Sequence, residues 1–291
     1  MTDLIDSLAD ISDIYDAVFC DLWGCLHNGV KPFPDAVAAL QQFRAAGGVV
    51  VLLTNAPRPK ASVVRQLDKI GVPHDAYDEV VSSGDASQYG MLSGLVGTKV
   101  YHLGPQKDLS FFTDLPADID GKEITRMPLD QAEGIVCTGL FDDQTETPED
   151  YRATLLYAKQ KGMKLLCTNP DLVVDMGETR IFCAGAIAAL YTRMGGESLY
   201  FGKPHPPIYD LARRRLAAFK RVPDDRILAI GDGIHTDIQG GLAEGFDTLF
   251  ITGGLAAAEF GPDPANPDYL KVQAWFLAHE ISATAAIPFL R

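Results

Sequence analysis

The chain has 291 residues, 47% of them hydrophobic, so it is long enough to form one or two globular domains with substantial cores. Its formal net charge of −14 argues against nucleic acid or an anionic membrane surface as a partner, because both are polyanions. No apolar stretch has the length of a membrane-spanning helix and the acidic N-terminus does not resemble a signal peptide, so we expect a cytoplasmic protein.

The first predicted strand ends in an acid. Residues 17–20 are apolar and lead directly to Asp21, and Gly24 then allows a tight turn. A helix is predicted over 34–46, because proline and aspartate suit its first turn and two glycines follow it. The pattern therefore places a carboxylate at the carboxyl end of a strand.

The second predicted strand ends in groups that suit a phosphate. Residues 49–53 are aliphatic and β-branched, and they are followed by Thr54-Asn55, which offers a hydroxyl and free backbone amides. A helix over 59–70 and a short strand at 80–81 come next.

The middle of the chain predicts a separate α/β unit. Strands are expected over 99–103, 134–137 and 164–167, with a helix from residue 147 or 148 to residue 161. We interpret this unit as a cap inserted into the first domain.

Two further strand ends carry charged residues. A short strand over 198–202 is expected to return the chain to the core and to present Lys203, which can neutralise a carboxylate or a phosphoryl oxygen. Another strand, over 226–230, ends just before Asp232, and Asp237 follows five residues later. The remaining expected elements are a helix over 206–219, a helix over 236–243 and a strand around Thr248.

Alternation of strands and helices predicts an α/β protein with a Rossmann-like, doubly wound parallel-sheet core. The core is expected to be discontinuous, over 1–84 and 198–291, and residues 85–197 to form the inserted α/β cap. Ligands bind at the carboxyl ends of strands in such sheets. The polar residues at the four strand ends should therefore meet in one crevice.

With these motifs in place, the chain resembles the haloacid dehalogenase superfamily of aspartate-dependent phosphohydrolases. The family's four motifs match Asp21 with the Gly24 turn, Thr54-Asn55, Lys203, and Asp232 with Asp237, in the family's order and spacing. The cap position resembles the branch that includes pyridoxal phosphate, 4-nitrophenyl phosphate and nucleotide monophosphatases. Dehalogenases carry their cap between the first two motifs, so the resemblance disfavours a dehalogenase.

The resemblance implies a role for each of these residues, and Mg²⁺ as the cofactor. Asp21 would be the nucleophile that forms an aspartyl-phosphate, and Lys203 would assist catalysis and bind phosphate. Thr54 and Asn55 would also bind phosphate. Mg²⁺ would be held by Asp21, Asp232 and the backbone carbonyl of Trp23, with Asp237 orienting the ion's waters or Lys203.

The cap is expected to select a small phosphorylated metabolite, such as a sugar or nucleotide-like phosphate. By resemblance, Asn169, Pro170 and Asp171 stand where the family's cap loop reaches the active site. Asp171 could accept hydrogen bonds from a sugar hydroxyl or a ring amine, or it could cap its own turn. A homodimer formed through the cap is also implied, whereas nucleic acid and membranes are not expected as partners.

One position departs from the family pattern. The first motif usually reads Asp-x-Asp, and its second aspartate is the general acid that protonates the leaving group; here that position is Trp23. An indole cannot exchange a proton near neutral pH. A second hypothesis is therefore a phosphate-binding protein that has lost turnover. His27 could replace the missing acid, although we favour a role for it in shaping the Asn28-Gly29 turn.

The cysteine pattern indicates structural thiols. The five cysteines include no C-x-x-C pair and several lie in predicted apolar strands, so we expect free, buried thiols in a reducing compartment. Cys20 and Cys25 flank the expected nucleophile, but apolar burial would make them inert.

Overall fold

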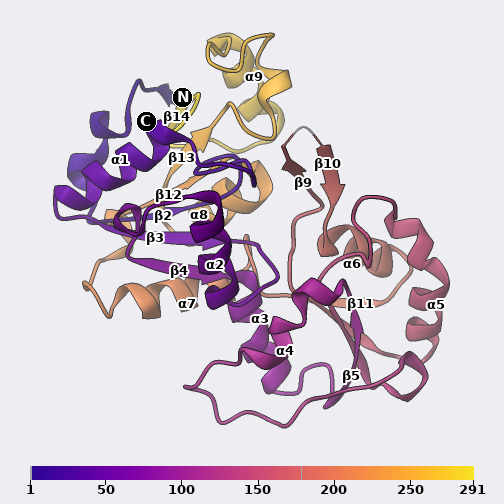
Figure 1. The fold of residues 1–291 in the computed structure, drawn as a ribbon. Helices are drawn as coiled ribbons and strands as arrows, with labels where there is room; N and C mark the ends of the chain where they lie inside the picture. Colours follow the sequence, from indigo (N-terminus) through magenta and orange to yellow (C-terminus); the bar gives the residue numbers. More distant parts are fainter. Residues whose placement is uncertain (1, 178) are drawn as a thin grey trace.

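The computed structural model describes residues 2–177 and 179–291 and contains two parallel sheets (Figure 1). The larger sheet has seven strands in the order β1-β14-β13-β12-β2-β3-β4, and every neighbouring pair is parallel. Its strands are β1 (Asp3–Leu4), β14 (Ala285–Ile287), β13 (Asp247–Ile251), β12 (Ile227–Gly231), β2 (Ala17–Cys20), β3 (Val49–Thr54) and β4 (Glu79–Ser82). The predicted doubly wound core is confirmed.

Helices cover both faces of this sheet, which explains why its central strands are continuous apolar runs. Val18 and Cys20 of β2 pack into one hydrophobic cluster, and Ala17 and Phe19 pack into another, because successive side chains of a strand point to opposite faces. The first cluster includes α1 (Pro34–Ala45) and α2 (Lys60–Ile70), and the second includes α3 (Ser83–Leu92) and α7 (Pro206–Leu216).

The cap is built on a second parallel sheet, with strands in the order β11-β8-β7-β5-β6. These strands are β11 (Glu197–Tyr200), β8 (Lys164–Cys167), β7 (Gly134–Cys137), β5 (Lys99–Leu103) and β6 (Thr125–Arg126). One face packs against α5 (Arg152–Gln160) and α6 (Ala184–Arg193), and the other against α3 and α4 (Ser110–Thr113). The central strands are thus buried on both faces, as in the core.

A two-stranded antiparallel hairpin extends from the cap toward the core (Figure 1). It consists of β9 (Val173–Met176) and β10 (Thr179–Phe182). The Gly177 amide donates a hydrogen bond to the carbonyl of Asn28 at 3.2 Å, so the hairpin contacts the loop that follows β2. We did not predict this hairpin, because its sequence has no turn dipeptide strong enough to mark it.

The expected position of the strand at 198–202 was wrong. β11 pairs with β8, with Ser198 opposite Leu165 and Leu199 opposite Leu166, so it is an edge strand of the cap sheet and not a core strand. A short apolar run does not reveal which of two sheets it joins. The chain returns to the core only after Tyr200, in the loop that carries Lys203.

Smaller differences concern helix ends. The helix expected over 236–243 begins earlier, as a π-helical turn over Ile234–Ile238 that continues into α8 (Gln239–Ala243). The helix expected to reach residue 219 ends at Leu216. The first boundary of the cap, between residues 84 and 85, falls within α3 and stays a prediction.

Two further observations concern the whole of the described chain. All five cysteines are free and buried, as expected. Among the residues that the structure describes, none of the helices is long and apolar enough to cross a membrane.

The C-terminal part of the chain adds α9 (Tyr269–Ala278), which packs beside β13 and β14 through Val272 and Phe276.

Candidate active site

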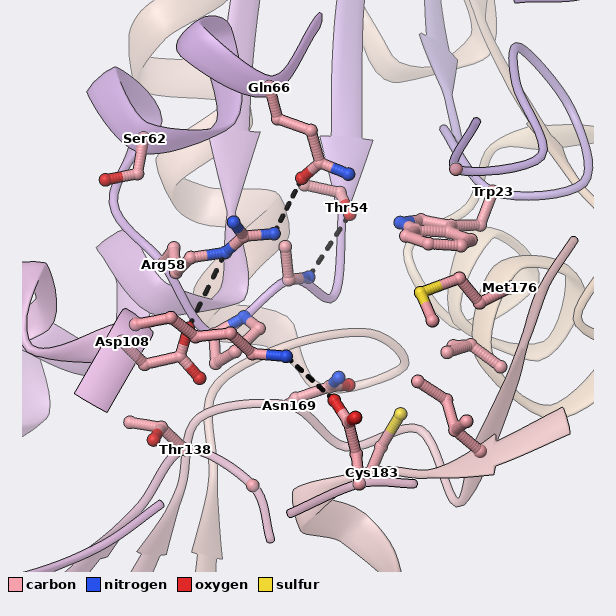
Figure 2. Close-up of a pocket in the computed structure, with 18 of the residues that line it drawn as sticks. Trp23, Thr54, Arg58, Ser62, Gln66, Asp108, Thr138, Asn169, Met176 and Cys183 are labelled. Carbon is pink, nitrogen blue, oxygen red and sulfur yellow. Dashed lines mark hydrogen bonds and ion pairs between the residues drawn. The ribbon is translucent and has the colours of Figure 1, made fainter. Parts of the chain in front are cut away.

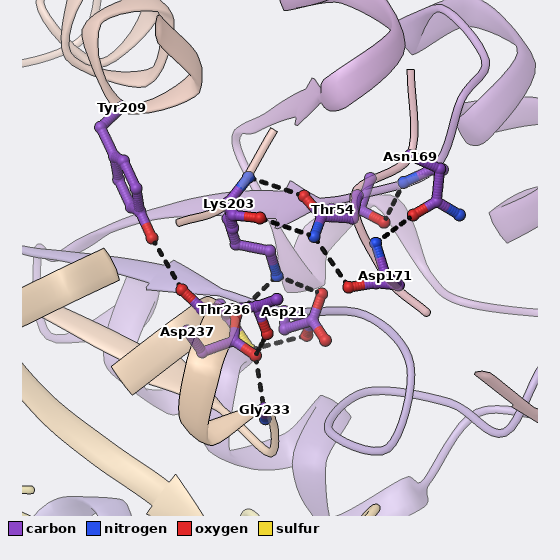
Figure 3. A network of polar contacts seen from close by, with 12 residues as sticks. Asp21, Thr54, Asn169, Asp171, Lys203, Tyr209, Gly233, Thr236 and Asp237 are labelled. Carbon is purple, nitrogen blue, oxygen red and sulfur yellow. Dashed lines mark hydrogen bonds and ion pairs between the residues drawn. The ribbon is translucent and has the colours of Figure 1, made fainter. Parts of the chain in front are cut away.

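Lys203 lies between two carboxylates at the centre of the site (Figure 3). Its ammonium nitrogen donates to Asp21 Oδ1 at 2.7 Å and to Asp237 Oδ1 at 2.6 Å, and the residue is only 2% exposed. Burial alone would lower the pKa of this ammonium, but the charges of Asp21, Asp237 and Asp171 more than offset it and hold that pKa well above its usual range. The lysine is therefore a fixed positive charge beside Asp21.

Asp21 follows β2, as the sequence predicts, and is largely buried. Burial raises the pKa of its carboxyl, and the neighbouring Lys203 opposes this increase. Burial likewise raises the pKa of the Asp237 carboxyl, to about 6, and the charge of Lys203 again opposes this increase. Its other oxygen, Oδ2, accepts from the Gly233 amide at 3.1 Å, so the side chain is held at both ends.

The donor set beside Asp21 fits a divalent cation. Asp21, Cys25 and Asp232 each offer a ligand atom, and these atoms lie within 4.8 Å of one another. Burial first, and the charge of Asp21 second, raise the pKa of Asp232 well above its usual range. A cation would relieve the repulsion between these two buried carboxylates. Carboxylate oxygens are the ligands that Mg²⁺ prefers, whereas the Cys25 thiol, whose pKa burial raises further, is unsuited to it.

Two glycines form the cradle around Asp232. A Cβ atom on Gly24 would lie 2.1 Å from Asp232 Oδ2, and one on Gly254 would lie 2.2 Å from it. Gly24 also has a φ of +74°, a conformation that side chains disfavour. The Leu255 amide donates to Asp232 Oδ2 at 2.9 Å. Close approach of these loops to the carboxylate therefore requires glycine, which supports a compact binding site.

Thr54 and Asn55 reach the site in different ways. Thr54 lines the large cavity described below, and its Oγ1 accepts from the Ala56 amide at 3.2 Å. The Asn55 side chain is instead bound to Lys203: its Oδ1 accepts from the Lys203 amide at 2.8 Å, and its Nδ2 donates to the Lys203 carbonyl at 3.1 Å. Asn55 therefore positions the backbone of the lysine, a role that sequence reasoning missed.

Of the three cap residues that the sequence singled out, two face the cavity. Asn169 and Asp171 line it, whereas Pro170 packs against Gly202, where a Cβ atom would lie 2.7 Å from the proline ring. Asp171 Oδ1 accepts from Asn55 Nδ2 at 2.8 Å, and the Asp171 amide donates to Asn169 Oδ1 at 3.0 Å. The turn is thus closed by Asn169, and Asp171 ties the cap to the core.

Trp23 lines the same cavity, while His27 does not. His27 is 1% exposed, its Nδ1 accepts from the Gly29 amide at 3.0 Å, and burial lowers its pKa to about 4. Its ring packs edge-on against the Trp23 indole, with centroids 5.2 Å apart. The Asn28 side chain accepts from two later amides of the turn. These contacts agree with a role for His27 in the turn and not with a role as the substitute acid.

The cavity between core and cap has a volume of about 770 Å³ (Figure 2). Strand ends from both sheets meet in it: Asp21 and Thr54 come from the core, and Thr138 and Asn169 follow cap strands. The β9–β10 hairpin adds an apolar wall beside Trp23, which consists of Val174, Met176, Ile181 and Phe182. The cavity is therefore larger than a phosphate requires and has both apolar and polar walls.

Sequence reasoning also missed several polar residues of this cavity, among them Arg58 and Asp108. Arg58 lies four residues after Thr54, so its nearness to a strand end was a usable signal. Asp108 follows β5 within an ordinary polar stretch that carries no motif.

Comparison with known proteins decides the family. Residues 18–116 match the model of haloacid dehalogenase-like hydrolases, and residues 200–273 match a second, HAD-hydrolase-like model. A solved structure of a hydrolase of the haloacid dehalogenase-like family from Brucella suis 1330 is 40% identical, with a TM-score of 0.86 over 99% of this chain and 100% of that one. The chain belongs to the haloacid dehalogenase-like hydrolases.

Two other proteins that resemble this chain are phosphatases by name. Dihydroxyacetone phosphatase of Corynebacterium glutamicum (strain R) is 31% identical over 111 residues, which are 38% of this chain and 39% of that protein. The chain thus matches about two fifths of the length of this curated relative. A glycerol phosphate phosphatase of Mycobacterium tuberculosis, solved in complex with calcium, shares the fold with 23% identity and a TM-score of 0.62, over 84% of this chain and 68% of that one.

Proposed function

We propose that the protein is a Mg²⁺-dependent phosphohydrolase that cleaves a small sugar-like or nucleotide-like phosphate through an aspartyl-phosphate intermediate. The observation that carries this proposal is the buried contact between Lys203 Nζ and Asp21 Oδ1 at 2.7 Å, where Asp21 lines the cavity between core and cap. A carboxylate nucleophile must be ionised. The lysine opposes the burial that would otherwise protonate it.

The residues of the chain account for each part of the transfer. A carboxylate oxygen of Asp21 would attack phosphorus in line, so that the Asp21–phosphorus bond forms as the bond to the leaving oxygen breaks. Lys203 and the Thr54 hydroxyl would bind phosphoryl oxygens, while Asn55 holds the backbone of Lys203. Water would then hydrolyse the aspartyl-phosphate and release inorganic phosphate.

Asp21, Asp232 and the backbone carbonyl of Trp23 would hold the cation. Bound Mg²⁺ would neutralise negative charge on the phosphoryl group. Asp237 would act through Lys203, whose ammonium it contacts at 2.6 Å. The calcium bound to the mycobacterial phosphatase supports a divalent cation in this fold.

The proposal includes a limited ability to protonate the leaving group. Trp23 lines the cavity where the family's general acid normally stands, and buried His27 does not face that cavity. Loss of general acid catalysis typically costs about 10² to 10⁴ in rate for poor leaving groups. The non-catalytic alternative is less favoured, because the nucleophile, the lysine and both cation-side acids are retained and the named relatives are phosphatases.

The proposal also covers the location of the protein in the cell, its oligomeric state and its domain boundary. Free, buried cysteines are typical of a reducing compartment, so we propose a cytoplasmic location. A homodimer through the cap also stays a proposal, and so does the division of the chain near residue 84.

A screen of phosphorylated metabolites tests this function. Phosphate release should be seen with at least one sugar or nucleotide-like phosphate in the presence of Mg²⁺, and it should stop when the cation is chelated. The Asp21→Asn variant should be inactive on the same compounds. Hydrolysis that is unaffected by chelator, or equal in the variant, would overturn the proposal.

A further inference from the structure

The cavity is lined by as many basic as acidic side chains, although the protein as a whole is strongly acidic. Four basic side chains line it, against a formal net charge of −14 for the chain; these are Arg58, Arg65, Lys69 and Lys107. Figure 2 shows Arg58 on the opposite side of the cavity from Trp23. Of these groups, Arg58 belongs to the loop that follows β3, the strand that ends in Thr54.

Arg58 is only partly engaged by its neighbours. Its Nη2 donates to Gln66 Oε1 at 2.6 Å, but Gln66 is neutral. Its Nε lies 3.7 Å from Asp108 Oδ1, which is too long for a hydrogen bond. By contrast, Arg213, whose side chain is as exposed as that of Arg58, contacts Asp224 at 2.9 Å and Glu244 at 2.6 Å. Arg58 therefore keeps hydrogen-bond donors available to a ligand, and Asp108 lies close enough to offset part of its charge.

Asp108 shows that this pair is incomplete. The residue is 3% exposed, and its Oδ1 makes no hydrogen bond to any residue within 2–177 or 179–291. Burial raises the pKa of its carboxyl to about 6, against the opposing charges of Arg58 and Lys107. Buried polar atoms without partners are rare and require an explanation. A ligand that draws the guanidinium into place would supply one.

The other acids of the cavity do not compete for Arg58. Asp143 is paired with Lys107 at 2.8 Å, and Asp171 accepts from Asn55 at 2.8 Å. Asp21 is paired with Lys203. The guanidinium fork of Arg58 is thus the group at this side of the cavity best suited to an oxyanion, which it can bind through two parallel hydrogen bonds.

We propose that Arg58 binds a second anionic group, a carboxylate or a second phosphate, on the part of the substrate that leaves when phosphate is transferred. Gln66 acts as a positioning residue, since its Oε1 accepts a hydrogen bond from the guanidinium at 2.6 Å. The proposal rests on the proposed function, because it assumes that the first phosphate is bound at Asp21. A cavity of about 770 Å³ accommodates such a larger ligand.

A matched pair of compounds tests this subsite, namely phenyl phosphate and 4-carboxyphenyl phosphate, which differ by one carboxylate. Their kcat and KM values, or their inhibition of 4-nitrophenyl phosphate hydrolysis, are measured for the wild-type protein and for Arg58→Gln, Arg58→Lys and Arg214→Gln. Arg214 stacks on Tyr89 and does not line the cavity, so its variant controls for the change in net charge.

The wild-type protein should prefer the carboxylated compound. Arg58→Gln should weaken binding of that compound by about 10- to 100-fold, mainly through KM, as expected for a charge-assisted hydrogen bond. Phenyl phosphate should change by less than about threefold, Arg58→Lys should recover part of the loss, and Arg214→Gln should behave like the wild type.

Other results would overturn the subsite. These are equal effects of Arg58→Gln on both compounds, no wild-type preference, or failure of the carboxylated compound to bind. In each case Mg²⁺-dependent hydrolysis in the metabolite screen would still support the proposed function. If that screen detects no hydrolysis at all, the proposed function itself fails, and the subsite proposal fails with it.

Discussion

The two sides of the cavity differ in how completely their charged groups are paired. At the core strand ends, Lys203 contacts Asp21 and Asp237 at 2.7 and 2.6 Å, and Asn55 uses its whole side-chain amide on neighbours. On the opposite side of the cavity, Arg58 Nε lies 3.7 Å from Asp108 Oδ1. A fixed, paired arrangement suits chemistry that is the same for every substrate, and a loosely paired one suits recognition of a particular substrate.

The largest expected effect comes from removing the nucleophile. Asp21→Asn keeps the shape of the side chain but cannot form the phosphoryl intermediate, so turnover should fall by at least about 10³-fold on every substrate. Arg58→Gln should spare phenyl phosphate, which makes it the control from the other side of the cavity. If the Asp21 variant were about as active as the wild type, Asp21 would not be the nucleophile, and the core side of the cavity would not be the catalytic side.

Cation affinity should separate two acids of the core side. Asp232→Ala should raise the Mg²⁺ requirement sharply, because Asp232 lies in the group of ligand atoms around Asp21. Asp237→Ala should raise it less, because Asp237 contacts Lys203. Calorimetric titration with Mg²⁺ measures the order. Equal affinity in both variants and the wild type would mean that the cation binds elsewhere.

An acid placed at position 23 should sharpen the comparison further. Trp23→Asp should raise the rate on alkyl phosphates by up to about 10²-fold and should change the rate on aryl phosphates little, because only poor leaving groups need the proton. Steady-state rates on an alkyl and an aryl phosphate test this. Brisk alkyl phosphate hydrolysis by the wild-type protein, lost in His27→Ala, would instead make His27 the acid.

The smallest expected effect concerns Asp171, the cap residue that accepts a hydrogen bond from Asn55 of the core. Burial raises the pKa of Asp171 to about 6, against the opposing effects of Lys203 and Asn55. Ionised Asp171 therefore costs folding free energy above pH 6, and the cost fades as the pH falls toward the usual pKa of 3.8.

Asp171→Asn should consequently be more stable than the wild type at pH 8, by no more than about 3 kcal/mol. The difference should shrink at pH 4.5. Thermal unfolding of both proteins at the two pH values measures it, and a variant that is less stable at pH 8 would show that the carboxylate stabilises the cap-to-core contact.

The sequence was informative where a polar residue directly follows a buried apolar strand. This pattern predicted that Asp21, Thr54 and Asp232 would meet, and in the structure Asp21 lines one cavity with Thr54 and a second cavity with Asp232. Lys203 was placed correctly for the wrong reason, because the strand before it pairs with β8 of the cap. Local sequence does not specify which of two parallel sheets a short edge strand joins.

The other features of the site depend on tertiary contacts, which no short stretch of sequence indicates. Commitment of the Asn55 amide to Lys203 requires residues 148 positions apart to meet. The apolar side chains of the β9–β10 hairpin are recognisable as a cavity wall only because the folded chain places them in the same cavity as Trp23. The incomplete pairing of Arg58 with Asp108 likewise follows from distances, since either residue alone would read as an ordinary surface charge.

Transfer of phosphate to Asp21 is the central claim, and acid quenching tests it most directly. The wild-type protein is mixed with its best substrate and Mg²⁺, quenched within a fraction of a turnover, digested, and analysed by mass spectrometry. We predict a phosphorylated peptide that contains Asp21, absent in Asp21→Asn and without Mg²⁺. A phosphoryl group on another residue, or turnover with no phosphorylated peptide under conditions that preserve acyl phosphates, would contradict the account.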